Sequence, residues 1–296
     1  MSRLQIRHKT ACRYDRKVSL GPHRLMLRPR ESRDLQLTSI DFSIEPGAEP
    51  TWARDVFGNA VATATFGDPS ARLSIESVAD VTISADPWPI FDIAASAITY
   101  PFLYSDDEWI DLGALTVVQS PGADRLTVWA RAFVQRPGTD TLSLLKDLSD
   151  GIARSLQYEI REEEGTQSPM ETLDLGRGSC RDFAVLFAEA VRSLGFGARI
   201  VSGYLFDAAG VAVGTSATGS THAWSEVYLP GAGWITFDPT NRSLGNHNLI
   251  PVAVGRSIDQ IVPVAGSYAG AVDALEEMSV TVDVRALPTT DGVPAN

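Results

Sequence analysis

Cys180 stands immediately before the most strongly periodic helical segment of the chain, a position that favours thiol chemistry. The lead-in is Gly176-Arg177-Gly178-Ser179-Cys180-Arg181-Asp182, and apolar residues then recur at helical spacing up to Leu194. The first turn of a helix has unpaired N–H groups and a positive dipole end, which together favour an anion. A thiol there loses its proton more readily, and the thiolate is the nucleophile. Position alone leaves a second interpretation equally open, in which the cysteine only fills a gap at the helix start.

A cysteine nucleophile needs a base, and the best placed of the four histidines is His222. His222 begins a strand-like segment that runs to residue 229, and Asp238 ends the next one, 234–238. His8 falls in an N-terminal strand pattern, where a core histidine with satisfied hydrogen bonds is the expected interpretation. His23 and His247 lie in turn-like contexts without helpful neighbours.

Side-chain alternation predicts that His222 and Asp238 share one face of a β-hairpin. The turn signal between the two segments is Pro230-Gly231-Ala232-Gly233. The apolar alternate residues of both segments should face the core, which puts His222 and Asp238 on the other face. A turn with an odd number of residues, or with a bulge, then places Asp238 opposite or diagonal to His222. At that distance Asp238 could fix the imidazole tautomer and stabilise the imidazolium.

The elements before this constellation are mainly strands. Residues 4–14 alternate apolar and basic side chains, and further strand-like runs follow to residue 83, separated by turn clusters. This pattern predicts a small antiparallel β-sandwich over residues 1–88. Cys12 is expected on its inward face as inert packing.

After Asp86-Pro87-Trp88-Pro89 the sequence pattern changes from mainly strand-like to mixed helical and strand-like. A helix is predicted over 139–157, followed by the Cys180 helix and strands at 198–205, 222–229 and 234–238. A last alternating strand is expected at 278–287 and is assigned to the second region, 89–296. The acidic loop at 161–165 is interpreted as solvated surface. The fold class is therefore α+β.

Composition limits the classes of function. The chain has 296 residues and a formal net charge of −12, which disfavours nucleic acid and anionic membranes as partners. Residues 1–36 are locally basic, and a solvated sheet face paired with the acidic body is favoured over a polyanion site. Two cysteines, no apolar run long enough for a membrane span and no visible export signal favour a cytoplasmic protein.

The motifs together resemble the transglutaminase-like superfamily of papain-like cysteine enzymes. The resemblance rests on Gly178-Ser179-Cys180-Arg181-Asp182-Phe183-Ala184, then His222-Ala223-Trp224, then Asp238-Pro239-Thr240. Residues 1 to about 85, including Asp55-Val56-Phe57-Gly58-Asn59, are similar to the β domain that precedes this core in bacterial members. Residues 255–264 are similar to their C-terminal segment.

The resemblance implies a papain-like core and acyl transfer through a thioester. Cys180 would attack an amide carbonyl of a peptide or protein, His222 would transfer the proton, and Asp238 would orient the imidazole. Tyr158 could support the oxyanion or line the cleft, and Trp224 could shield the His–Asp pair. Plain packing is an alternative for both aromatic residues.

Arg181 and Asp182 are expected to brace the helix start rather than to react. No metal requirement is expected, because no calcium-binding loop of the Asp-x-Asp-x-Asp-Gly type is present, and no other cofactor is expected. Water as the acyl acceptor would make the protein a peptidase or amidase, which is weakly favoured, whereas an amine would make it a transglutaminase. Two alternatives remain: a non-catalytic scaffold that binds a peptide in the same cleft, and acyl transfer from a small thioester to an arylamine.

Overall fold

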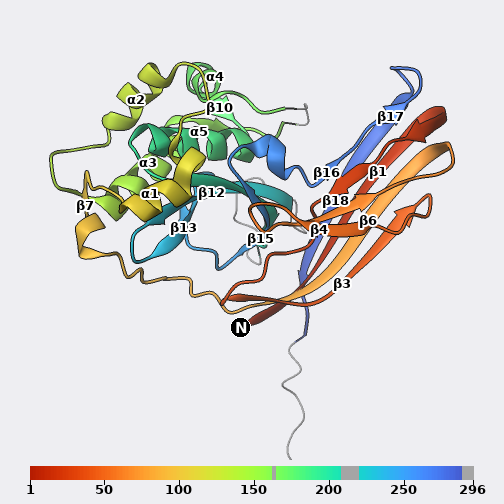
Figure 1. The fold of residues 1–296 in the computed structure, drawn as a ribbon, viewed down its shortest axis with the longest axis horizontal. Coiled ribbons are helices and arrows are strands. Elements are labelled where there is room, and N and C mark those ends of the chain that lie inside the picture. The colour runs from red at the N-terminus through yellow and green to blue at the C-terminus, as the bar shows by residue number, and fades with distance from the viewer. Residues whose placement is uncertain (162–164, 208–219, 289–296) are drawn as a thin grey trace, which may run out of the picture.

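The structure is a computed structural model that describes residues 1–161, 165–207 and 220–288. A β-rich part holds both ends of the described chain, and a mixed part carries the helices (Figure 1). Residues 162–164 of the predicted acidic loop lie outside the described residues. The fold is mixed α+β, as the sequence predicts. Among the described residues, no helix has the length and apolar character needed to cross a bilayer.

The β-rich part is organised around one long strand, β1 (Ser2–Leu20). Strand β6 (Ser70–Ile83) pairs with one edge of β1, and β3 (Leu35–Glu45) pairs with β6. On the other edge of β1 lie β18 (Leu275–Ala286) and β17 (Tyr268–Ala269). All of these pairings are antiparallel.

A second antiparallel sheet covers part of the first. Its strand order is β16 (Val264–Ala265), β2 (His23–Leu25), β5 (Ala60–Ala64) and β4 (Thr51–Arg54). Buried residues of both sheets, such as Tyr14 and Leu73 from the first and Leu25 and Ala62 from the second, form one apolar cluster. The N-terminal region is therefore β-rich with an apolar layer between sheets, as the turn-separated runs predict.

The alternation predicted for β1 is confirmed. Leu4, Ile6 and His8 are buried, whereas Arg7 and Lys9 are exposed. The period of two in a strand puts successive side chains on opposite faces, and here one face meets the core while the other meets solvent.

The last strand belongs to the N-terminal sheet, whereas the sequence analysis assigned it to the second region. Strand β18 runs along β1 from the pair Leu4–Ala286 to the pair Tyr14–Leu275. Val282 and Val284 of β18 are buried against the core by this pairing. The alternation of β18 indicates a strand but does not specify its neighbour. In the structure β18 pairs the edge of β1 that β6 leaves open.

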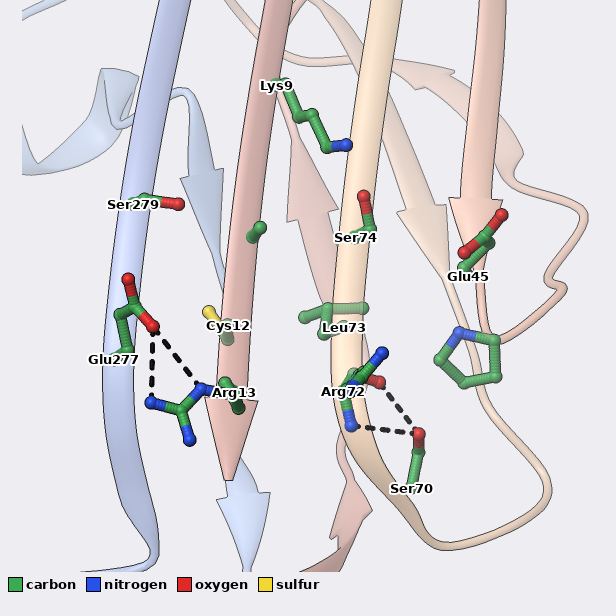
Figure 2. Close-up of a pocket in the computed structure, with 12 residues that line it drawn as sticks. Lys9, Cys12, Arg13, Glu45, Ser70, Arg72, Leu73, Ser74, Glu277 and Ser279 are labelled. Carbon is green, nitrogen blue, oxygen red and sulfur yellow. Dashed lines mark hydrogen bonds and ion pairs between the residues drawn. The ribbon is translucent and has the colours of Figure 1, made fainter. Parts of the chain in front are cut away.

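The basic outer face of β1 is paired with acidic residues from neighbouring strands, which agrees with the favoured interpretation. Arg7 Nε lies 2.6 Å from a carboxylate oxygen of Glu76 on β6. Figure 2 shows Glu277 of β18 reaching Arg13 of β1, with 3.3 Å between Nε and Oε2. This face also forms a hollow lined by residues of β1, β6 and β18, which does not include Cys180.

The mixed part contains an antiparallel sheet with helices on one side. Its order is β14 (Ser243–Leu244), β13 (Gly233–Asp238), β12 (Ser220–Leu229), β11 (Ala198–Leu205) and β15 (Leu249–Gly255). Helix α5 (Cys180–Ser193) packs on β12. Helices α2 (Ala123–Arg131), α3 (Thr141–Ser155) and α4 (Pro169–Leu175) contact α5 (Figure 1).

Short elements complete the chain. They are α1 (Asp106–Leu112), β7 (Thr99–Tyr100), β8 (Thr139–Asp140), β9 (Gln157–Tyr158), β10 (Arg177–Gly178) and the 3-10 turns η1 (Ala95–Ala97), η2 (Gly113–Thr116) and η3 (Ile258–Ile261).

Helix α5 is the centre of the hydrophobic core. The apolar stripe predicted on this helix, including Phe183, Leu186, Phe187 and Val191, is at most 1% exposed. The same cluster extends to Ile6 of β1, so the two parts share one continuous core.

A buried ion pair fixes the far end of α5. Glu189 and Arg192 are 2.6 Å apart (Oε1 to Nη1), and both side chains are almost fully buried. The other Glu189 oxygen accepts the backbone N–H groups of Gln119 and Ser120, and Arg192 donates to the carbonyl of Ala198. Each charge is therefore compensated by its partner and by backbone groups, as burial requires.

We expect Glu189→Ala to lower the free energy of unfolding by about 3–5 kcal/mol, because it leaves the Arg192 charge buried and unpaired. Urea unfolding followed by circular dichroism measures this loss. The matched control is Asp174→Ala, which removes the exposed ion pair with Arg125 and should change stability little. Equal losses in the two variants would contradict the assigned role of the buried pair.

Candidate active site

Cys180 is the first residue of α5, and a buried carboxylate builds the turn before it. Asp182 accepts hydrogen bonds from the N–H and the hydroxyl of Ser179, both at 2.8 Å, which caps the helix. Arg161 Nη1 lies 3.0 and 2.9 Å from the two carboxylate oxygens of Asp182, and the N–H of Gln167 donates to it at 2.7 Å. Asp182 thus braces the helix start, as expected from the sequence.

Tyr158 lies beside this turn. Its strand β9 pairs in parallel with β10, and Tyr158 is opposite Gly178. A Cβ atom on Gly178 would lie 2.9 Å from Cβ of Asp182, so a side chain there would displace the brace. Burial, followed by the charges of Cys180 and Asp238, raises the pKa of the Tyr158 hydroxyl. The hydroxyl of Tyr158 therefore keeps its proton at neutral pH.

The hairpin of β12 and β13 has the register that the alternation argument requires. Leu229 pairs with Gly233, so an odd number of residues, 230–232, forms the turn, and Ser225 pairs with Phe237. This register puts Asp238 diagonal to His222. Nε2 of His222 lies 2.8 Å from Oδ2 of Asp238, and both side chains are buried.

Asp238 also accepts hydrogen bonds from Thr240 and Asn241, to which the sequence analysis assigned no role. Its Oδ1 accepts the N–H of Thr240 at 2.9 Å, and its Oδ2 accepts the side-chain amide of Asn241 at 2.9 Å. Burial alone would favour the protonated acid, but the charge and hydrogen bond of His222 together with these donors lower the pKa of Asp238. An aspartate followed by Pro-Thr-Asn is a signal for an Asx turn, and it could have indicated these contacts.

Cys180 and His222 each shift the pKa of the other. Burial disfavours the thiolate, but the hydrogen bond and positive charge of His222 outweigh it and lower the pKa of Cys180. Burial likewise disfavours the imidazolium, whereas Asp238 and then Cys180 raise the pKa of His222. Both shifts favour a thiolate–imidazolium pair at neutral pH.

Trp224 packs next to the imidazole. Its ring is 1% exposed and faces the His222 ring at 6.1 Å between centroids, with 28° between the planes. The tryptophan also belongs to a small apolar cluster with residues of β11 and β15. It therefore covers one side of His222 and packs against the sheet at the same time, so the two interpretations from the sequence are compatible.

His8, His23 and Cys12 lie outside the candidate site and make other contacts. His8 is buried, its Nδ1 lies 3.0 Å from the Tyr204 hydroxyl, and burial lowers its pKa to about 4. This agrees with the prediction of a core histidine. The Nδ1 of His23 bonds the carbonyl of Gly21 at 2.8 Å. Burial raises the pKa of Cys12, as is typical of an inert thiol. In the described part of the chain, no group of three or more His, Cys, Asp or Glu is arranged to hold a metal ion.

Two family models match separate parts of the chain. The bacterial transglutaminase-like N-terminal region matches residues 4–82, and the transglutaminase-like superfamily matches residues 128–239, which include Cys180, His222 and Asp238. Together they span both parts of the fold.

Similar proteins agree with these matches. An uncharacterized protein of Mycobacterium leprae is 35% identical over 120 residues, which cover 40% of this chain and 42% of its own length. An uncharacterized protein of Mycobacterium tuberculosis is 26% identical over 299 residues, covering 95% of this chain and 92% of its own. The crystal structure of a protein from Cytophaga hutchinsonii, described as a "putative cysteine protease", has the same fold: TM-score 0.74, 20% identity, 99% of this chain and 93% of that one. The chain therefore contains a core of the transglutaminase-like superfamily, residues 128–239, which follows a bacterial transglutaminase-like N-terminal region, residues 4–82.

Proposed function

We propose that the protein is a cysteine enzyme that acts on amide bonds of peptides or proteins through a thioester at Cys180. The observation that carries this proposal is the buried hydrogen bond between His222 and Asp238, together with the influence of His222 on the pKa of Cys180 at the start of α5. A nucleophile, a base and a group that orients the base are the parts that acyl transfer requires. The superfamily membership supports the same class of chemistry.

In the first half of the reaction, the Cys180 thiolate attacks the amide carbonyl carbon and forms the C–S bond. The oxyanion that results lies near the first turn of α5, where the backbone N–H of Cys180 can stabilise it. The C–N bond then breaks, and the imidazolium of His222 gives its proton to the leaving amine. The products are the thioester on Cys180 and a neutral imidazole.

In the second half, His222 removes a proton from the acceptor as the acceptor attacks the thioester. Water yields a carboxylic acid, and an amine yields a new amide; in both cases Cys180 leaves as the thiolate and His222 is protonated again. Asp238 keeps Nε2 of His222 as the bonded nitrogen, which leaves the other ring nitrogen for Cys180.

We assign supporting roles to the two aromatic residues. Tyr158, whose strand pairs with Gly178 two residues before Cys180, keeps its phenolic proton and can donate it to the oxyanion or to bound substrate. Trp224 excludes water from one side of the His222 ring, and the low polarity there strengthens the interaction between His222 and Asp238.

A mass-spectrometric assay on a glutamine-containing peptide library, with and without an added primary amine, tests the proposed activity and identifies the acceptor. We expect wild-type protein to produce shorter peptides, deamidated peptides or amine adducts, and Cys180→Ala to produce none of them. Cleavage or deamidation identifies water as acceptor, and adducts identify the amine. Peptides that bind to the wild-type protein but remain unmodified would instead support the scaffold alternative, and products formed by Cys180→Ala would exclude this cysteine as the nucleophile.

For the substrate that the library identifies, we expect Asp238→Asn to lower kcat by about 10⁴-fold with little change in KM, because the amide no longer stabilises the imidazolium or its tautomer. Steady-state kinetics measure both constants. Asp182→Asn offers a matched comparison, since this acid braces the helix start without contacting His222 in the described residues, and a smaller loss is expected. An unchanged kcat in Asp238→Asn would show that another group orients His222.

A further inference from the structure

A loop of the N-terminal region, Asp55–Asn59, is hydrogen-bonded to the sheet that carries the candidate site. Asn59 is fully buried, and its side-chain amide bonds both backbone groups of Val254 in β15. The amide nitrogen donates to the Val254 carbonyl at 2.7 Å, and the amide oxygen accepts the Val254 N–H at 2.9 Å. The loop therefore satisfies backbone groups of the sheet as a neighbouring strand would.

The loop is also fixed internally. Asp55 Oδ1 accepts the N–H groups of Phe57 and Asn59, both at 2.9 Å, and Asp55 Oδ2 accepts the Asn59 amide at 2.7 Å. Arg30 Nη1 donates to the Asn59 amide oxygen at 2.6 Å and to the carbonyl of Phe57 at 3.2 Å. Gly58 adopts a φ of 74°, which favours glycine. These contacts leave Phe57 little freedom to move away from the sheet.

Phe57 covers the apolar cluster that contains Trp224. The cluster consists of Val201, Leu205, Trp224, Leu249 and Val254, and Phe57 packs against it. In the sheet, Val201 pairs with Trp224 on one side and with Val254 on the other, so the three form a row across β12, β11 and β15. Phe57, which belongs to the N-terminal region and not to this sheet, thus packs against the cluster that contains the three residues of this row.

The neighbouring Gly203 makes room for the tryptophan. It pairs with His222 across β11 and β12, and a Cβ atom there would lie 2.7 Å from Cη2 of Trp224 and 2.1 Å from the carbonyl oxygen of Ile250. The Trp224 ring is therefore confined between the sheet below it, the cluster beside it and the His222 ring, which it faces at 6.1 Å.

We propose that Phe57 is a positioning residue for His222, and that the loop Asp55–Asn59 gives the N-terminal region a part in catalysis. The loop presses Phe57 onto the Trp224 cluster, and Trp224 keeps the imidazole turned so that one nitrogen meets Asp238 and the other meets Cys180. This inference rests on the proposed function, because it assigns a role relative to that site.

A purely structural role for Phe57 would lower stability without changing how Cys180 ionises. Loss of positioning would let the imidazole turn away from Cys180, and the thiol would lose the partner that favours its thiolate. The pH dependence of Cys180 alkylation separates these two cases, because the thiolate is the form that reacts.

The experiment follows iodoacetamide modification of the peptide containing Cys180 by mass spectrometry, on the full-length protein across a pH series and below the unfolding temperature of every variant. We expect wild type to react with a midpoint below the usual value for a thiol, and Phe57→Ala to react with a midpoint at least one unit higher, or about tenfold more slowly near pH 6. Phe57→Leu should shift less, because it restores part of the packing. The control Val56→Ala changes the adjacent, 96% exposed residue and should behave as wild type.

The outcomes distinguish the two proposals. A low wild-type midpoint that Phe57→Ala leaves unchanged overturns the positioning role while the proposed function stands. An ordinary thiol midpoint in wild type overturns the proposed function, and the positioning role with it. If Phe57→Ala does not fold, Phe57→Leu decides alone: a midpoint above that of Val56→Ala supports the positioning role, and an equal midpoint overturns it.

Discussion

The buried hydrogen bond between His222 and Asp238 is the interaction on which the rest of the candidate site depends. A buried imidazolium is costly unless a negative charge lies on at least one side of it, and here a carboxylate and a thiol meet the ring. Asp238 is itself restrained by hydrogen bonds from Thr240 and from the backbone and side chain of Asn241, so its carboxylate is held facing the ring. The influence of His222 on the pKa of Cys180 favours the thiolate.

Three separate stretches of chain bring these groups together. Helix α5 presents Cys180 from a turn braced by Asp182, and the same helix is anchored at its far end by the Glu189–Arg192 pair. The hairpin of β12 and β13 fixes His222 relative to Asp238 by its register. The N-terminal region shares the core with α5 and contributes a loop to the other face of the sheet. A packing change in any of these elements would shift the side chains of the site, because the close-packed core between the elements is continuous.

Much of the site could be predicted from the sequence because it rests on local periodicity. The apolar stripe of α5 places Cys180 at a helix start, and alternation in the two strands places His222 and Asp238 on one face. The pairing of β18 with β1 could not be predicted, since alternation indicates a strand without identifying its neighbour. The contact of Phe57 with the Trp224 cluster could not be predicted either. A single aromatic residue in a turn has no periodic pattern, and its contacts are set by the tertiary fold.

The most direct test of the central claim is a titration of the Cys180 thiolate by ultraviolet absorbance, taken as the difference between wild type and Cys180→Ser. The account predicts that the thiolate signal is present near pH 6, well below the usual thiol pKa of about 8.5, and that it disappears at this pH in His222→Ala. A signal that rises only near pH 8.5 in wild type, or one that His222→Ala leaves unchanged, would contradict the account.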